Sequence, residues 1–428
     1  MNKLALSLRL SFVFIFFSIS NASYSTGVEY FGFYSSDVGG TNILNNYPTV
    51  STFSNISWIL DSQNALVSSD INAAAMKGQK SIIDLSFVFF MRDPDTNALV
   101  PNNSAQANWT ALATLIASQK SDIAAFYPID EPNGNNISAA YIQWINTTIR
   151  ASFPGTPIAV IYSEGADPSS IQYYDWVGFD CYSNGQFMCG TTNYTSSYAT
   201  LKSYLTSSQR IILVPQVGVS GGTSVTAALV NNLTWESLRL YELAYGDPQI
   251  IGMFGFVYQS QAGWTGLVGL PTSLQATVTN VGQTVMRNWT YPAGIVPVYR
   301  FTKTNATTDH LFTLTEQEGI GAAIAGQYSY EGFGFSVYTT ELAGTHPLYR
   351  CQSGTASHFI SEQINCEGYT LQSLLGYVSI SQTSTTVPLY RFFNSHNGSH
   401  LETIDYAEGT GAGLTYEGIL GYSPSVQF

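Results

Sequence analysis

Basic side chains are scarce in this chain of 428 residues. Lysine and arginine together number 15, against 28 aspartates and glutamates, which gives a formal net charge of −13. Proteins bind nucleic acids and anionic membranes through basic patches that neutralise phosphates, so this composition argues against both kinds of partner. The surplus of acid by itself indicates only a soluble, self-repelling protein.

Histidine is missing from the first 309 residues, because the five histidines are His310, His346, His358, His396 and His400. Their absence from the N-terminal part excludes a Ser-His-Asp or Cys-His catalytic group there, and a histidine-ligated metal as well. The sequence also has no Cys-x-x-Cys motif. We therefore expect no structural zinc site, and no metal or organic cofactor is implied.

Cysteine is rare, and its four copies fall into two local pairs, Cys181 with Cys189 and Cys351 with Cys366. An even number of cysteines in an oxidising compartment predicts that each pair forms a short-loop disulfide.

Long apolar runs are confined to the N-terminus. A basic start with Lys3 is followed by an apolar stretch over residues 4–19 and then by small polar residues. This order predicts a secretory signal peptide over residues 1–24, cleaved near Ala22 to Ser25. A membrane anchor is the alternative, but Ser7, Arg9 and Ser11 interrupt the run. No later run reaches about 18 apolar residues, so we expect no membrane span in the mature chain.

Motifs of the type Asn-x-Ser/Thr are dense, which is typical of a secreted, extracellular glycoprotein with sugars on surface helices and loops. The predicted glycosylation sites are Asn55, Asn102, Asn108, Asn136, Asn146, Asn193, Asn232, Asn288, Asn305 and Asn397.

Residues 25–290 alternate between apolar strands and amphipathic helices. The predicted strands are 30–34, 56–60, 81–89, 123–129, 158–162, 176–180, 211–217 and 251–258, and the predicted helices are 65–77, 109–118, 139–151, 198–207 and 227–245. Eight strands that alternate with helices over this length predict a closed parallel (β/α)8 TIM barrel. A doubly wound open sheet is the alternative, and it is disfavoured because no Gly-x-Gly-x-x-Gly turn follows the first strand.

A second domain is predicted over residues 291–428, where the helical pattern gives way to three repeats at about 296–340, 346–380 and 387–424. The first repeat contains Pro297-Val-Tyr299-Arg300-Phe301, Asp309-His310 and Tyr330-Glu331-Gly332, and related motifs recur in the other two. In the second repeat we align Cys366-Glu367-Gly368 with Tyr330-Glu331-Gly332. Three such units predict an all-β module with pseudo-threefold symmetry, either β-trefoil-like or a small barrel.

Three histidines, His310, His358 and His400, occupy the same point of the three repeats. Equivalent positions in a symmetric module are more often structural than catalytic, and a buried ring needs a hydrogen-bond partner. Three equivalent sugar-binding sites are the functional alternative.

The acids of the barrel carry its chemistry, since histidine and free cysteine are missing there. Asp130 and Glu131 end the apolar segment Phe126-Tyr-Pro-Ile-Asp130-Glu131-Pro132, and Asp180 ends the sixth predicted strand. In a TIM barrel the C-terminal ends of the strands carry the active site. Glycoside hydrolysis needs two carboxyl groups, one of which keeps its proton near neutral pH, and an apolar setting raises a carboxyl pKa. Helix capping by Asp130 or Glu131, and a structural role of Asp180 beside the Cys181–Cys189 loop, are the alternatives.

The N-terminal unit resembles the TIM-barrel glycoside hydrolase superfamily. Asp130-Glu131-Pro132 resembles the Asn-Glu-Pro that ends the fourth strand in cellulase- and mannanase-like enzymes, and this resemblance implies that Glu131 is the acid/base. Those enzymes place a nucleophilic glutamate at the end of strand seven, where this chain has Gln216. Asp180 could supply the second carboxyl, as in α-galactosidase- and α-glucosidase-type barrels. Asp130 could instead orient the substrate's acetamido group, as in hexosaminidases, or the barrel could bind glycan without cutting it.

Aromatic and amide side chains near the predicted strand ends are candidate sugar contacts or packing residues. They are Gln216, Tyr182, Tyr162, Gln259, Tyr258 and Trp264.

The C-terminal repeats resemble a family of secreted three-repeat modules of unknown function, which implies extracellular localisation. The sequence therefore favours a secreted glycoside hydrolase-like protein that acts on a carbohydrate polymer or glycan. The alternative is a catalytically inactive glycan-binding or extracellular matrix protein, and a structural protein with neither role is a third reading.

Overall fold

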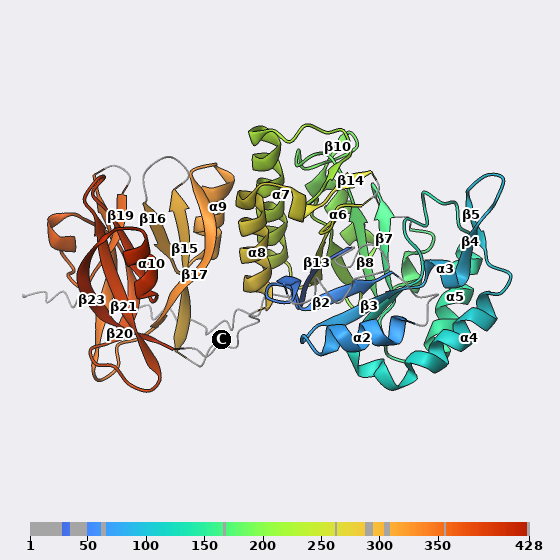
Figure 1. Cartoon of the computed structure of the whole chain (residues 1–428), viewed down its shortest axis with the longest axis horizontal. Coiled ribbons are helices and arrows are strands. Elements are labelled where there is room, and N and C mark those ends of the chain that lie inside the picture. Colours follow the sequence, from blue (N-terminus) through green and yellow to red (C-terminus); the bar gives the residue numbers. More distant parts are fainter. Residues whose placement is uncertain are drawn as a thin grey trace, which may run out of the picture.

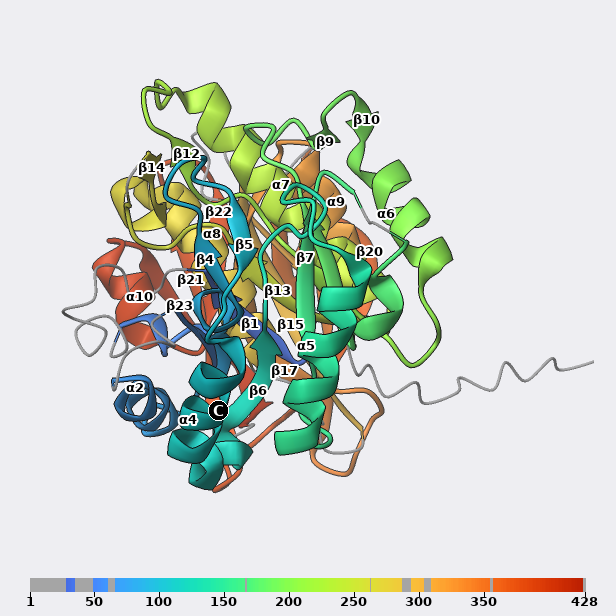
Figure 2. The same ribbon diagram turned by 90° about the vertical axis from the view of Figure 1, so that its right-hand side faces the viewer.

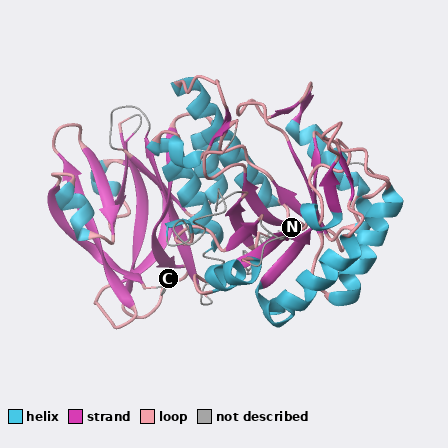
Figure 3. Ribbon diagram, turned by 45° about the vertical axis from the view of Figure 1, so that its right-hand side comes forward, coloured by secondary structure: helices cyan, strands magenta, loops and turns pink. Residues whose placement is uncertain are grey.

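The computed structural model describes residues 28–34, 49–60, 66–165, 168–261, 263–286, 294–303, 309–354 and 357–425. The predicted signal peptide, Asn288, Asn305 and the predicted domain boundary at residues 290–291 lie outside these residues. The described chain forms an N-terminal unit of strands wrapped by helices and a C-terminal unit built mainly of strands (Figures 1 and 3).

The N-terminal unit is a closed barrel of eight parallel strands, as the sequence predicts. Neighbouring strands follow the order β6-β3-β2-β1-β13-β11-β8-β7, and a parallel bridge between Phe126 and Ile158 joins the two ends of this sheet. The strands are β1 (Tyr30–Phe33), β2 (Ile56–Ile59), β3 (Lys80–Asp84), β6 (Ile123–Tyr127), β7 (Ala159–Ser163), β8 (Trp176–Asp180), β11 (Arg210–Leu213) and β13 (Ile250–Gly255).

Helices cover the outside of the barrel (Figure 2). They are α2 (Val67–Ala75), α4 (Ala105–Ile116), α5 (Ala139–Ser152), α6 (Tyr194–Tyr204), α7 (Ala227–Gly246) and α8 (Thr272–Met286). The last of these is not among the predicted helices. No described helix is long and apolar enough to cross a membrane.

The prediction of a single strand over residues 81–89 is wrong. Strand β3 ends at Asp84, whose Oδ1 accepts the backbone N–H of Ser86 at 2.8 Å and so turns the chain into the short helix α3 (Ser86–Phe89). A hairpin of β4 (Phe90–Arg92) and β5 (Leu99–Pro101) follows. Strand seven is also shorter than predicted: it ends at Leu213, two residues before Pro215, which has no N–H to continue a ladder.

Side chains alternate between two cores along each barrel strand. On β6, Ala125 and Tyr127 point into the barrel, whereas Phe126 packs outward against Trp109 of α4. On β7, Ile161 lies inside and Tyr162 outside. This alternation decides which strand residues can reach the C-terminal mouth of the barrel.

The C-terminal unit is one nine-stranded antiparallel sheet to which each repeat contributes three strands, and the repeats are joined by the pairs Tyr338–Tyr377 and Ser379–Tyr422. In every repeat a long strand pairs with a short strand on one side and with a second long strand on the other. The three repeats are β15 (Ile295–Lys303), β16 (His310–Thr313), α9 (Glu316–Ile324) and β17 (Tyr328–Tyr338); β18 (Thr345–Ser353), β19 (Ser357–Ser361), η4 (Cys366–Gly368) and β20 (Thr370–Ser379); and β21 (Thr386–Asn394), β22 (Ser399–Thr403), α10 (Tyr406–Gly411) and β23 (Thr415–Pro424). Apart from one short helical turn per repeat, this is the predicted all-β three-repeat domain.

Strand pairing corrects one alignment within the repeats. Phe301 lies opposite Tyr330 in the first repeat, and Cys351 lies opposite Leu371 in the second. Leu371, and not Cys366, is therefore the counterpart of Tyr330. Both predicted disulfides are present, and the one between Cys351 and Cys366 ties η4 to β18.

One predicted glycosylation site is incompatible with the fold. Asn146 is only 3% exposed, and its amide Nδ2 donates to the carbonyl of Ile142 within α5. A glycan on this side chain would have to displace the packing of α5, so Asn146 is corrected to a structural residue. By contrast Asn136, Asn193 and Asn397 are exposed.

Candidate active site

Four carboxyl groups lie at the C-terminal end of the barrel strands. Asp84 ends β3, Asp130 and Glu131 follow β6, and Asp180 ends β8. Parallel strands direct their C-terminal ends to one mouth of the barrel, and the charges interact there: Asp84 and Glu131 both raise the pKa of Asp130.

Glu131 is held in a turn beyond β6 by hydrogen bonds that do not involve its carboxyl group. Its φ is +44°, in the left-handed region that non-glycine residues adopt at a cost of about 1–3 kcal/mol. Its N–H donates to the carbonyl of Ile161 at 3.1 Å, and the amide of Asn135 donates to the carbonyls of Asp130 and Glu131. The next helix, α5, begins only at Ala139, so neither acid caps it.

Asp130 is half-buried and hydrogen-bonded to the barrel interior. The hydroxyl of Tyr127 donates to its Oδ1 at 2.5 Å. Burial raises the pKa of Asp130 to about 7, against the opposing effect of this hydrogen bond. Burial likewise raises the pKa of Asp84 to about 6, although the N–H of Ser86 stabilises its charged form.

Asp180 is 7% exposed and forms a pair with Glu131. Burial raises the pKa of Asp180 to about 8, and the next largest cause is the nearby charge of Glu131. The hydroxyl of Tyr182 donates to its Oδ2 at 2.8 Å and acts in the opposite direction. At neutral pH the carboxyl of Asp180 therefore keeps its proton and lies close to the carboxyl of Glu131.

Aromatic rings stand next to the pair. Tyr182 packs against Phe256 at 4.9 Å and against Trp264 at 5.3 Å between ring centroids, and Phe256 and Trp264 also meet edge to face. Tyr182 and Trp264, which are half-buried, thus remain candidate sugar contacts. Gln259 is half-buried as well, and its predicted contact remains a prediction.

Two predicted sugar contacts are corrected to packing residues. Tyr162 is fully buried outside the barrel wall, and its hydroxyl lies 2.8 Å from Oγ of Ser170. Tyr258 is 6% exposed and packs against the rings of Phe33 and Phe53. Both side chains lie in the layer between strands and helices, where a sugar has no access.

Gln216 is likewise a structural residue, only 1% exposed. Its Oε1 accepts the N–H of Asn184 at 2.8 Å, and its Nε2 donates to the carbonyl of Gly218 at 3.0 Å. Its own N–H donates to Oε1 of Glu236 in α7. The side chain thus ties the loop after β8 to the end of β11.

Sequence reasoning missed Asp84 and Tyr127. Asp84 was hidden because the predicted strand continued to Phe89, which placed this acid inside a strand instead of at its end. Its signal was available, since Asp84 is a lone acid in an apolar run, as the Asp130-Glu131 pair is. Within the described residues, no group of three or more histidines, cysteines or acids is placed to hold a metal ion.

The arginines of the Tyr-Arg motifs join the three repeats of the C-terminal unit. Arg300 pairs with Glu408 of the third repeat, Arg350 with Glu318 of the first, and Arg391 with Glu367 of the second, at 2.6–2.8 Å. Each arginine thus reaches the helical turn of another repeat, and the three pairs close a ring.

The recurring histidines lie beside these pairs. His310 and His400 each approach a glutamate of their own repeat, and burial lowers the pKa of both rings. His358 lies 3.3 Å from Asp309. These contacts favour the structural interpretation of the three rings.

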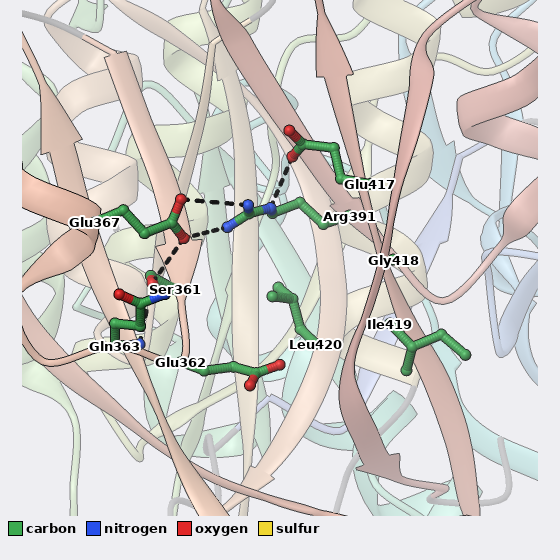
Figure 4. Close-up of a pocket in the computed structure, with 9 residues that line it drawn as sticks. All are labelled: Ser361, Glu362, Gln363, Glu367, Arg391, Glu417, Gly418, Ile419 and Leu420. Carbon is green, nitrogen blue, oxygen red and sulfur yellow. Dashed lines mark hydrogen bonds and ion pairs between the residues drawn. The ribbon is translucent and has the colours of Figure 1, made fainter.

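A cavity of about 210 Å³ opens between the second and third repeats (Figure 4). Arg391 crosses its wall between Glu367 and Glu417, and Glu362 and Ile419 also line it. The guanidinium of Arg391 is paired with both of these carboxylates.

The described chain thus combines a (β/α)8 barrel that carries an acid pair at its mouth with a three-repeat β module. Residues 280–365 and 355–424 match the model of a domain of unknown function, DUF5648. No curated protein matches the chain.

Solved structures that resemble the chain include TIM-barrel glycoside hydrolases. A psychrophilic glycoside hydrolase family 10 endo-β-1,4-xylanase is 11% identical over 55% of this chain and 91% of its own, with a TM-score of 0.39. Xylanase 10B from Thermotoga maritima is 8% identical over 62% and 98%, with a TM-score of 0.44. An α-amylase from Lactobacillus plantarum is 10% identical over 63% and 82%, with a TM-score of 0.37. Likeness at this level concerns the fold and does not transfer an activity.

Proposed function

We propose that the barrel hydrolyses glycosidic bonds of a carbohydrate polymer, with Glu131 as the proton donor. The observation that carries the proposal is the proximity of Glu131 to the buried carboxyl of Asp180: both follow strand ends at the barrel mouth, and the charge of Glu131 helps to raise the pKa of Asp180 to about 8. A carboxyl that keeps its proton near neutral pH is what general acid catalysis at a glycosidic oxygen requires.

The different burial of the two carboxyls assigns different roles to them. Asp180 is 7% exposed, whereas Glu131 is half-buried and is the acid of the two that a substrate can reach. Asp180 is therefore a positioning residue that supplies Glu131 with a proton. Glu131 passes a proton to the glycosidic oxygen as the bond to the anomeric carbon breaks. Water then adds to that carbon, and its proton returns through Glu131 to Asp180.

Asp130 is the group that steadies the positive charge developing at the anomeric carbon or orients a substrate acetamido group. Its hydrogen bond from Tyr127 fixes it next to Glu131. The rings of Tyr182 and Trp264 offer apolar faces for the sugar.

A hydrolysis screen tests the proposal. The purified chain is compared with Glu131→Gln, Asp180→Asn and the control Glu164→Gln on aryl glycosides and polysaccharides, including N-acetylhexosamine polymers. Glu164 is an exposed acid that follows β7. We expect Glu131→Gln to lower the rate at least about 100-fold and the control to leave it unchanged. Equal activity of Glu131→Gln and the parent contradicts the assignment, and inactivity of the parent on the whole panel contradicts the activity.

A second candidate function is glycan binding without hydrolysis. Gln216 favours it, because this side chain stands where related barrels carry a nucleophile and is fully engaged in hydrogen bonds. Retention of the chain by one polysaccharide that it does not cut, to the same extent in Glu131→Gln, would select this function.

We also propose that the chain is secreted after cleavage near Ala22 to Ser25 and glycosylated at its exposed Asn-x-Ser/Thr motifs. Exposure of Asn136, Asn193 and Asn397 supports this part. N-terminal sequencing and the mass shift on enzymatic deglycosylation of the secreted chain test it. An intact N-terminus or an unchanged mass would refute secretion-linked processing or glycosylation, respectively.

A further inference from the structure

The first repeat of the C-terminal unit docks on the barrel through an aromatic face. Helices α7 and α8 of the barrel pack against α9 and β17 (Figure 1). The ring of Tyr241 stacks on that of Tyr330, with centroids 6.2 Å apart and planes 29° from parallel. The hydroxyl of Tyr330 meets Oγ1 of Thr284 at 2.7 Å, and its carbonyl accepts from Asn280. As a result Tyr330 is only 2% exposed.

The third repeat carries the same face. Tyr416 lies opposite Phe392 in the strand ladder, as Tyr330 lies opposite Phe301. Both phenylalanines lie beneath a helical glycine: a Cβ on Gly319 would meet Phe301, and a Cβ on Gly409 would meet Phe392. The two faces therefore have the same strand pairing, equivalent pairs of aromatic rings and an equivalent contact between a phenylalanine and a helical glycine.

In the third repeat no described part of the chain covers this face. Tyr416 is 42% exposed, against 2% for its counterpart, and Tyr406 at the start of α10 is 44% exposed. Tyr406 stands where the first repeat has the buried Glu316, because each residue begins the helix of its repeat. With Tyr390, these rings form a cluster whose centroids lie 5.1–6.2 Å apart. We call Tyr390, Tyr406 and Tyr416 the tyrosine platform.

The size of the platform limits what it can bind. A buried aromatic side chain covers about 150–250 Å², so the two most exposed rings offer on the order of 200 Å² together. A stable protein interface buries about 800 Å² on each partner, and this patch falls well short of that area. One or two rings of a small or chain-like ligand fit it.

The chemistry of the platform selects a neutral, hydroxyl-bearing ligand. Tyrosine combines an apolar ring face with a hydroxyl that donates and accepts, and the nearby Glu408 and Glu417 are already paired with Arg300 and Arg391. In the first repeat, the Tyr241 ring over Tyr330 and the Thr284 hydroxyl beside it show what this face accepts: a flat ring with a hydroxyl at its edge. A sugar ring presents the same combination.

We propose that the tyrosine platform of the third repeat is a binding site for a neutral carbohydrate chain, separate from the mouth of the barrel. The ring of a sugar residue lies over Tyr416 as Tyr241 lies over Tyr330, and its hydroxyls bond to the tyrosine hydroxyls. The site does not depend on the proposed hydrolysis, because binding at the platform requires no chemistry in the barrel.

Affinity electrophoresis of the full chain tests the platform. Native gels contain xylan, glucomannan, hydroxyethyl cellulose or a soluble β-glucan, and polyanionic pectin serves as the charged comparison. The double variant Tyr406→Ala/Tyr416→Ala removes the two exposed rings. Tyr204→Ala is the matched control, because Tyr204 is a barrel tyrosine that is 43% exposed. Glu131→Gln reports on any binding at the barrel mouth.

We expect a neutral polysaccharide to retard the parent, and the double variant to bind about tenfold more weakly. Tyr204→Ala should bind as the parent does, and Tyr406→Phe/Tyr416→Phe should keep part of the affinity because the rings remain. An unchanged melting temperature shows that the double variant folds.

Any one of three results would overturn the proposal: that the double variant binds as well as the parent, that no neutral polysaccharide retards the parent, or that Glu131→Gln alone abolishes binding. Sedimentation equilibrium tests the remaining alternative, which is that the platform contacts a second copy of the protein. A parent that dimerises and a double variant that does not would show that the platform contacts protein instead of sugar.

Discussion

Replacing Glu236 by glutamine should make the protein more stable at neutral pH and leave its stability at acidic pH nearly unchanged. Glu236 lies in α7, is 3% exposed, and accepts the N–H of Gln216 with one carboxyl oxygen. Its other oxygen has no hydrogen-bond partner in the described part of the chain. Burial raises the pKa of Glu236 from 4.5 to about 8.

The sign and size of the stability difference between the parent and Glu236→Gln follow from proton linkage. A carboxyl whose pKa is higher in the folded than in the unfolded chain contributes stability that is fully present at pH values below its unfolded pKa. This contribution is lost as the pH rises through the folded pKa. Between the unfolded pKa of 4.5 and pH 7 the loss is 2.5 units, or about 3 kcal/mol. Glutamine keeps the acceptor for Gln216 and does not ionise, so its variant escapes this loss.

Urea unfolding of the parent and Glu236→Gln at pH 4.5, 6, 7 and 8 measures the difference. We expect the two midpoints to nearly coincide at pH 4.5 and to separate steadily up to pH 8. At pH 4.5 the variant should be slightly the less stable, because its amide N–H groups face the position of the unpartnered oxygen. A difference that stays constant with pH would refute the reasoning, because it would show that Glu236 does not change its protonation on unfolding.

Three further predictions concern other parts of the molecule. Any hydrolytic activity should fall as the pH rises through about 8, where Asp180 loses its proton, and Asp180→Asn should move or remove this alkaline limb of the rate profile. Gly319→Ala should destabilise the fold by about 1–3 kcal/mol, since its Cβ would lie 1.9 Å from the ring of Phe301. Gly321→Ala in the same helix has open space and should stabilise the fold by about 0.5–1 kcal/mol; calorimetry that ranks the two variants the other way would contradict the packing argument. Arg391→Met should lower the free energy of unfolding by about 1–2 kcal/mol, a value discounted for the solvent that reaches its partners, and an unchanged value would show that the pairs do not hold the repeats together.

The sequence predicted the barrel because its strands leave a strong signal. Strand β8 was predicted with both of its observed ends, since Trp176 to Asp180 is an apolar run that ends in an acid. Strands buried on both faces show no alternation of apolar and polar residues, so the sequence cannot reveal which side chains point inward. For that reason the sequence leaves open whether Tyr162 contacts a sugar or packs in the core, and the structure shows that it faces the helices.

The candidate site was only partly accessible to sequence reasoning. The sequence places Glu131 and Asp180 at the ends of different strands, but their proximity depends on the stagger of β6, β7 and β8 around the barrel. Local patterns do not encode that stagger. In the C-terminal unit, Cys366-Glu367-Gly368 resembles the Tyr-Glu-Gly motif, whereas strand pairing assigns that place to Leu371.

The ring of arginine–glutamate pairs sets the number of repeats. In an open solenoid each repeat contacts only its neighbours, so units can be gained or lost at either end. Here Arg300 of the first repeat is neutralised by Glu408 of the last, and removing or inserting one unit would separate these two partners. The module is therefore closed upon itself by these three pairs, and each repeat supplies one arginine and one glutamate to the closure.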